Sequence, residues 1–168
     1  CASHTIDDHG PKSTLPAKSS TAKSTTMDGA ACKVSALPHI AAMVIGLGLD
    51  IIEIARLRGV LDRHGERFAD RVFTAGEQEI AAGRPRTKEE FFAGRWAAKE
   101  AVAKALGCGF GTDCGWQDIE IINDNRGKPE VSLHGRARQT ADARGIKRLL
   151  VSISHEMHYA TAVAVAEE

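Results

Sequence analysis

The sequence predicts an α+β fold in which a mostly antiparallel sheet packs against one long helix. Three observations lead to this prediction. Apolar segments with strand-like composition lie near both ends of the periodic part of the chain, and one alanine-rich segment between them has helical period and length. The predicted strands and helices do not alternate strictly, as they would in a parallel βαβ protein, so antiparallel pairing is favoured.

The first predicted strand covers residues 44–52, with the sequence VIGLGLDII, and a helix follows over residues 53–65. In this helix apolar residues recur at helical spacing, and Gly65 is a residue that commonly ends a helix. Two further helices are predicted over residues 74–83 and 87–107, each closed by a glycine. Both open with a capping box, in which a threonine and a glutamate three residues later satisfy each other's backbone N–H groups: Thr74 with Glu77, and Thr87 with Glu90.

The second half of the chain is predicted to be mainly strand. A hairpin turns at the sequence NDNRGK, a short helix follows, and two further strands are joined by HEMH. The predicted segments are strands over 117–122 and 129–133, a helix over 135–145, and strands over 148–154 and 159–167.

Composition argues against several classes of partner. Lys and Arg together number 22, as do Asp and Glu, so no net charge attracts nucleic acid or an anionic membrane. The longest apolar stretch, residues 40–49, is much shorter than the roughly 20 residues of a membrane-spanning helix. The four cysteines form no CxxC pair, which predicts a reduced, cytoplasmic protein without a zinc site. We therefore expect no nucleic-acid or membrane partner.

The first 42 residues differ in composition from the rest of the chain. Residues 1–26 are rich in Ser, Thr and Lys and nearly free of large apolar side chains, so they cannot bury enough surface to offset the entropy lost on folding. We interpret residues 1–42 as a disordered tail or an artificially added segment, and residues 43–168 as one domain. Met27 and Met43 are both possible natural starts, and Met43 is favoured because the periodic pattern begins there.

The GLGLD stretch at residues 46–50 places two glycines and a carboxylate in an apolar strand. Strand alternation puts Gly46, Gly48 and Asp50 on one face and the apolar side chains of residues 45, 47, 49 and 51 on the other. We expect the apolar face to be the core face. The glycine face would let another backbone or a flat ligand approach closely. A bulge, or a tight strand–helix contact with Asp50 capping the next helix, explains the same pattern.

A second carboxylate occupies an unusual position in the long helix. Phe92 and Trp96 mark the stripe predicted to face the core, and Glu100 comes next on that stripe. A buried carboxylate needs a cation or a hydrogen-bonded partner. Lys104 lies one turn further on, and a Glu–Lys pair on a solvated face is the alternative interpretation. Together, Asp50 and Glu100 indicate a Mg²⁺ site completed by water and phosphate oxygens.

Basic side chains accompany these carboxylates on the same helix. We expect Arg95, Lys99 and Lys104 to supply positive charge to phosphate groups. Such a set of charges suits transfer at a phosphoanhydride, where positioning and charge neutralisation dominate catalysis.

Two other polar patterns have competing interpretations. The sequence SISHE, residues 152–156, could indicate a Ser–His nucleophile, but no G-x-S-x-G elbow accompanies it. A phosphate contact or proton transfer by His155 fits better, and a structural histidine is the alternative. In the first helix, Arg56, Arg63 and Arg67 share a face if the helix bends little at Gly65. That face is either solvated or a docking surface for an acidic partner helix.

The chain resembles the holo-acyl-carrier-protein synthases, the short 4′-phosphopantetheinyl transferases. The resemblance extends over residues 43–168 and rests on four sequences in this order: GLGLDIIEIARL, FFAGRWAAKEAVAKALGCGFG, QDIEIINDNRGKP and VSISHEMHYATAVAV. It implies the phosphopantetheinyl transferase fold, a homotrimer with active sites between subunits, and a role in fatty acid biosynthesis. The implied reaction moves the 4′-phosphopantetheine group of coenzyme A (CoA) to a serine of apo acyl carrier protein and releases adenosine 3′,5′-bisphosphate.

The resemblance also implies roles for individual residues. Asp50 and Glu100 would be the Mg²⁺ ligands, and with Lys104 they would form the catalytic set. Arg56 matches an arginine that meets an acidic residue of the carrier protein, and Arg67 and Phe68 would belong to the same docking surface. The implied CoA site contains these residues: Arg95, Lys104, Gly127, Lys128, Pro129, Ser154 and His155.

Some features depart from the family pattern, and other functions are open at this stage. Trp96 stands where the family more often has phenylalanine, which should alter packing and not chemistry. A non-catalytic CoA- or nucleotide-binding module would not need both Asp50 and Glu100. A Mg²⁺-dependent phosphodiesterase would usually have more metal-ligating side chains than these two.

Overall fold

The computed structural model describes residues 43–168, so the predictions for residues 1–42, including a start at Met27, lie outside the described residues. The elements in chain order are β1 (Val44–Glu53), α1 (Ile54–Val72), α2 (Ala75–Ala82), α3 (Lys88–Ala105), a 3₁₀ turn η1 (Trp116–Asp118), β2 (Ile119–Asn123), β3 (Pro129–Leu133), α4 (Gly135–Ala143), β4 (Arg148–His155) and β5 (Tyr159–Glu167).

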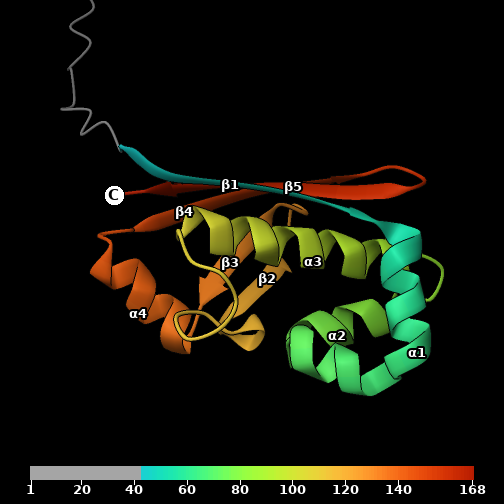
Figure 1. Ribbon diagram of the computed structural model, residues 1–168. Helices are drawn as coiled ribbons and strands as arrows, with labels where there is room; N and C mark the ends of the chain where they lie inside the picture. The colour runs from blue at the N-terminus through green and yellow to red at the C-terminus, as the bar shows by residue number, and fades with distance from the viewer. Residues whose placement is uncertain (1–42) are drawn as a thin grey trace, which may run out of the picture. The chain divides into compact units, whose positions relative to one another are not determined.

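The strands form two antiparallel sheets (Figure 1). One sheet has the strand order β1-β5-β4, and the other is the β2–β3 hairpin. Helix α3 packs against all three strands of the first sheet and also contacts β2. The predicted α+β class and antiparallel pairing are confirmed. The prediction of one long helix is too simple, because α1 has 19 residues and α3 has 18.

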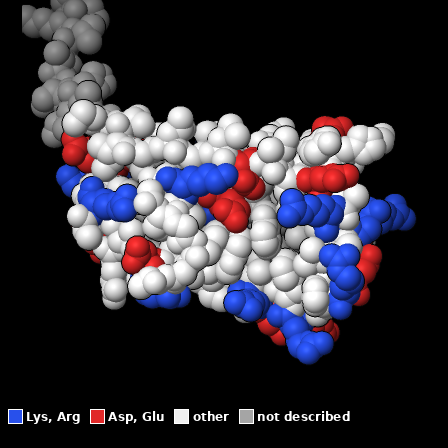
Figure 2. Space-filling view, viewed as in Figure 1, with Lys and Arg blue, Asp and Glu red and all other residues white. Residues whose placement is uncertain are grey.

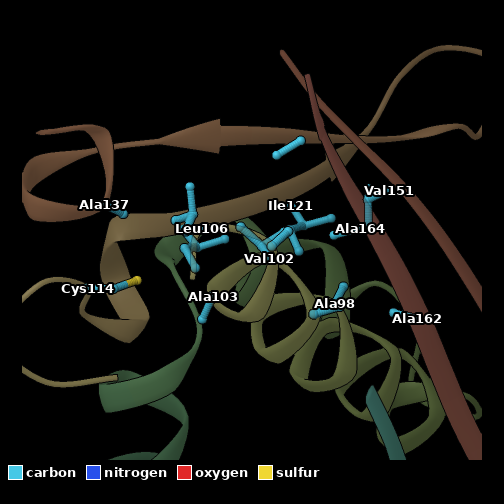
Figure 3. Packing of buried hydrophobic residues seen from close by; sticks show 14 of the residues in the cluster. Ala98, Val102, Ala103, Leu106, Cys114, Ile121, Ala137, Val151, Ala162 and Ala164 are labelled. Atoms are coloured by element: carbon cyan, nitrogen blue, oxygen red, sulfur yellow. The ribbon is translucent and has the colours of Figure 1, made fainter. Parts of the chain in front are cut away.

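Helix α3 contributes to two hydrophobic clusters. Small side chains of α3 pack against small side chains of β5 in the first cluster, and Figure 3 shows Ala98 and Val102 in the same cluster as Ala162 and Ala164. The second cluster combines aliphatic and aromatic side chains, and in it the rings of Phe73 and Phe92 stack with centroids 4.2 Å apart. The alanines let the helix lie close to the sheet, while the aromatic side chains fill the wider space beneath α1 and α2.

The two faces of β1 have the opposite orientation to the one predicted. A Cβ atom on Gly48 would lie 1.9 Å from the carbonyl oxygen of Ala101, and one on Gly46 would lie 2.1 Å from that of Ala105. The glycine face therefore packs directly on the backbone of α3. The apolar side chains of the other face are exposed by the following fractions: Ile45 41%, Leu47 66%, Leu49 60% and Ile51 60%. The prediction of this face as the core was wrong, because a strand that touches a helix backbone must present the smaller residues to it.

The ends of the helices confirm some local predictions and correct others. Thr74 and Glu77 form the predicted capping box. Thr87 makes no capping hydrogen bond, because its φ and ψ of −128° and 23° are not those of the extended conformation that a capping residue usually adopts. Gly65 interrupts α1 with φ 55° and ψ −137°, and helical structure resumes up to Val72. The arginines before and after Gly65 therefore do not share one continuous helix face.

The surface of the described part carries charges of both signs. On the side seen in Figure 2, Lys and Arg are interspersed with Asp and Glu, and the upper margin, along which β1 and β5 run in Figure 1, is largely uncharged. None of the helices in residues 43–168 combines the length and the apolar character that crossing a membrane requires.

Candidate active site

Asp50 and Glu100 line the same cavity, which has a volume of about 330 Å³. Asp50 lies near the end of β1, and Glu100 lies on α3. Arg56 and the aromatic side chains of Phe68 and Trp96 line the cavity as well. Glu100 is partly exposed at this cavity and not in the core position that the helical stripe predicted. The close packing of β1 on α3 brings the two carboxylates together.

The two carboxylates and Lys104 interact electrostatically. Burial raises the pKa of Glu100 above its usual value, the negative charge of Asp50 raises it further, and Lys104 opposes the shift. The Nζ of Lys104 donates hydrogen bonds to Oδ1 of Asp50 at 2.8 Å and to the carbonyl oxygen of Leu49 at 2.9 Å. Lys104 therefore pairs with Asp50 across the strand–helix contact, and not with Glu100 along the helix, which was the alternative interpretation of the sequence. Thr161 of β5 holds the Asp50 carbonyl through its hydroxyl, with an O–O distance of 2.8 Å.

The donor set at this cavity fits a hard divalent cation. Both acidic side chains offer carboxylate oxygens, and their mutual repulsion would be relieved by a positive charge between them. Mg²⁺ is commonly bound by one or two carboxylates, with water and phosphate oxygens as its other ligands. Within residues 43–168, no three His, Cys, Asp or Glu side chains gather to form a larger metal cluster.

A second cavity, of about 390 Å³, collects four of the predicted CoA residues. They are Arg95, Gly127, Pro129 and His155. Arg95 is buried, and its Nη2 donates to Oδ1 of Asn123 at 2.7 Å. Burial lowers the pKa of Arg95 to about 10, so this side chain is still a cation at neutral pH. Its Nε is buried without a hydrogen-bond acceptor among the described residues.

The second cavity also has polar residues that the sequence prediction missed. Arg84, Thr87 and Asn123 line it together with Arg95. Asn123 could have been noticed, because a polar residue at the end of an apolar strand beside a glycine turn often serves a site. Arg84 lies between two helices, and no local pattern distinguishes it from an ordinary solvated arginine.

The structure does not bring all predicted site residues together. No residue lines both of the cavities described above. Lys128 lines a different cavity, of about 200 Å³, with Pro129. Ser154 is exposed on β4, and Arg67 is exposed on α1 beyond the break at Gly65. Within one chain, the predicted metal ligands and most predicted CoA residues thus belong to separate cavities.

The predicted phosphate contact by Lys99 is wrong. The side chain of Lys99 is 0% exposed and forms an ion pair with Glu77, which is also 0% exposed, with Nζ 2.9 Å from Oε2. The Nζ also donates to the carbonyl oxygens of Trp116 at 3.0 Å and Ile119 at 2.6 Å. Glu77 was missed as a partner because its role in the capping box already explained it. Lys99 and Glu77 join α2, α3 and the start of β2, so their role is structural.

Comparison with known proteins supports the interpretation of these residues as a functional site. A family profile described as "4′-phosphopantetheinyl transferase superfamily" matches residues 46–164, which include Asp50, Glu100 and Lys104. The chain belongs to this superfamily. It is 47% identical over 124 residues to the holo-[acyl-carrier-protein] synthase of Vibrio atlanticus, covering 74% of this chain and 98% of that protein. It is 48% identical over 123 residues to the same-named protein of Protochlamydia amoebophila, covering 73% of this chain and 98% of that protein.

Solved structures of phosphopantetheinyl transferases are similar as well. The holo-[acyl-carrier-protein] synthase of Neisseria meningitidis matches with a TM-score of 0.70 and 32% identity, covering 75% of this chain and all of that chain. The Helicobacter pylori enzyme, solved in complex with coenzyme A, matches with a TM-score of 0.64 and 31% identity, covering 71% of this chain and 98% of that chain. The resemblance of the sequence to this family is therefore confirmed.

Proposed function

We propose that this chain is a holo-acyl-carrier-protein synthase. It would transfer the 4′-phosphopantetheine group of CoA to a serine of apo acyl carrier protein, in fatty acid biosynthesis. The observation that carries the proposal is the meeting of Asp50 and Glu100 at one cavity, with Lys104 paired to Asp50. Relatives that bear this enzyme name match the same part of the chain at close to half of its positions.

The chemistry of the transfer assigns a task to each of these residues. The serine oxygen bonds to the β-phosphorus of CoA, the serine proton passes to a base, and adenosine 3′,5′-bisphosphate leaves with the bridging oxygen. The ammonium of Lys104 offsets negative charge that collects on the phosphoryl oxygens. Asp50 and Glu100 would hold Mg²⁺, which when bound neutralises charge on the pyrophosphate.

The second cavity is the proposed place of the nucleotide end of CoA. The guanidinium of Arg95 and the imidazole of His155 face this cavity and can meet phosphate oxygens. Gly127, Lys128 and Pro129 form the turn beside the cavity, and Ser154 precedes His155 on β4.

A homotrimer would explain why the two halves of the site are separate in one chain. The exposed side chains of residues 45, 47, 49 and 51 form one continuous apolar face on β1. Such a face differs from the single apolar residues that are scattered over an ordinary protein surface. We propose that this face packs against neighbouring copies, so that the Asp50 cavity of one subunit lies beside the Arg95 cavity of the next. One CoA could then span both.

The carrier protein is proposed to dock beside Asp50 and Glu100. Arg56 and Phe68 line the same cavity as these carboxylates, and the exposed Arg67 adjoins Phe68. This arrangement offers positive charge and an apolar contact to an acidic helix. A docked carrier would present its serine directly to the reaction site.

Mass spectrometry of the carrier protein tests the proposal. The full chain is incubated with CoA, Mg²⁺ and apo carrier, and the carrier should gain the mass of one phosphopantetheine group. The variant Glu100→Gln should lose this activity, whereas Glu79→Gln, an exposed change on α2, should keep it. An unmodified carrier together with CoA binding would instead support the non-catalytic module. The predicted cytoplasmic location stays a prediction.

A further inference from the structure

Lys104 occupies a position that is lined by oxygen atoms. Its Nζ lies 2.8 Å from Oδ1 of Asp50 and 2.9 Å from the carbonyl oxygen of Leu49. The charge of Lys104 also acts on Glu100, so both carboxylates experience the same ammonium. Carboxylate and carbonyl oxygens are the atoms that a hard cation selects. The ammonium therefore sits where positive charge is most needed.

We propose that Lys104 is an internal substitute for the divalent cation at Asp50. Its ammonium pairs with Asp50 when no metal ion is bound, and it must give up this contact when a metal ion binds. The inference rests on the proposed Mg²⁺ site at Asp50 and Glu100. It adds a competition between a residue of the chain and the metal ion for the Asp50 carboxylate.

Differences in exposure make the exchange feasible. The side chain of Lys104 is 47% exposed, so it can swing into solvent at low cost. The side chain of Asp50 is only 18% exposed, so leaving its negative charge without a cation costs more free energy. Once released, the ammonium is still on α3 beside the cavity, where it can turn to a phosphate group. Metal binding and the arrival of Lys104 at the substrate are thereby coupled.

Metal binding without CoA provides a direct test. Isothermal calorimetry measures Mn²⁺ binding to the full chain, to Lys104→Met and to Lys104→Arg. Removal of the competing charge should tighten binding by about fivefold in Lys104→Met, the size expected for a partly exposed ion pair. Lys104→Arg keeps the charge and should bind like the unchanged chain. Lys147→Met, which removes an exposed lysine from the loop before β4, controls for the change in overall charge.

Thermal unfolding gives a second measurement. In the presence of a chelator, Lys104→Met should unfold at a lower temperature than the unchanged chain, because its carboxylates lack a counter-charge. Added Mn²⁺ should raise the midpoint of this variant by more than that of the unchanged chain.

The outcomes separate this inference from the proposed function. Equal or weaker Mn²⁺ binding by Lys104→Met overturns the competition and leaves the metal site standing. If Asp50→Asn, Lys104→Met and the unchanged chain all fail to bind Mn²⁺, the metal site and the competition both fall. Persistent transfer activity would then show that the enzymatic proposal survives without a metal at Asp50.

Discussion

Substitution of Gly48 by alanine should damage both stability and catalysis. The new Cβ would lie 1.9 Å from the carbonyl oxygen of Ala101 and 2.7 Å from the backbone nitrogen of Ala105. Both atoms belong to the backbone of α3, so no side chain can rotate away. A tolerable contact requires at least 3.0 Å, which means that β1 and α3 must separate by about 1 Å at this point.

The size of the effect follows from this displacement. Overpacking of a core usually lowers the free energy of unfolding by about 1–3 kcal/mol. Because the new Cβ clashes with two backbone atoms, we expect Gly48→Ala to lower it by about 3 kcal/mol. For a domain of this size such a loss lowers Tm by about 10 °C. Asp50 lies two residues beyond Gly48, so the strand carries it away from Glu100. A misplacement of about 1 Å can slow a reaction about 100-fold.

Thermal unfolding and the rate of carrier modification check this prediction. Gly59→Ala is the matched control, because a Cβ there would meet only Nη1 of Arg63, at 3.4 Å, in the interior of α1. The control should be as stable as the unchanged chain or more stable by about 0.5–1 kcal/mol, since alanine favours a helix. If Gly48→Ala matched the unchanged chain in both Tm and rate, the argument from close packing would be refuted.

Three further variants test the buried pair, the reaction site and the docking surface. Lys99→Met should lower the free energy of unfolding in urea by about 3–5 kcal/mol, because it leaves the Glu77 carboxylate buried and unpaired. Adding Glu77→Gln should recover part of that loss, because it removes the unpaired charge and keeps an oxygen that can accept from a backbone N–H of Thr74 or Ile121. If Lys99→Met alone were as stable as the unchanged chain, the argument from the buried pair would be contradicted. Because the folded pKa of Glu100 is raised, its contribution favours folding below its unfolded pKa and is lost as pH rises through the folded value. With a chelator present, the difference in Tm between Glu100→Gln and the unchanged chain should therefore change in favour of the variant as pH rises from acidic to neutral. Tm curves that stay parallel over this pH range would count against a raised pKa of Glu100. Arg56→Glu should weaken carrier binding more than CoA binding in calorimetry, whereas an equal loss of both would exclude docking at this arginine.

Much of the local structure was predictable because its causes are local. The helical segment around the alanines of α3 and the capping box at Thr74 depend on residues within a few positions of each other, and both predictions were confirmed. Thr87 carries the same residue pattern and forms no cap, because its backbone conformation is set by the loop that leads into α3. A pattern therefore indicates which cap a residue can form, and the surrounding chain decides whether it forms.

The sequence by itself determined the kinds of elements, their antiparallel class and the family, since periodicity and motifs are properties of neighbouring residues. Only the tertiary structure decided that the glycine face of β1 lies on α3. Both faces of the strand lack charge up to Asp50, so the alternation of residues does not indicate which face packs on the backbone of the helix. Only the fold revealed that Lys99 pairs with Glu77, 22 residues away in the chain, and that Lys104 reaches Asp50. Such long-range contacts depend on how the elements pack, which no local pattern records.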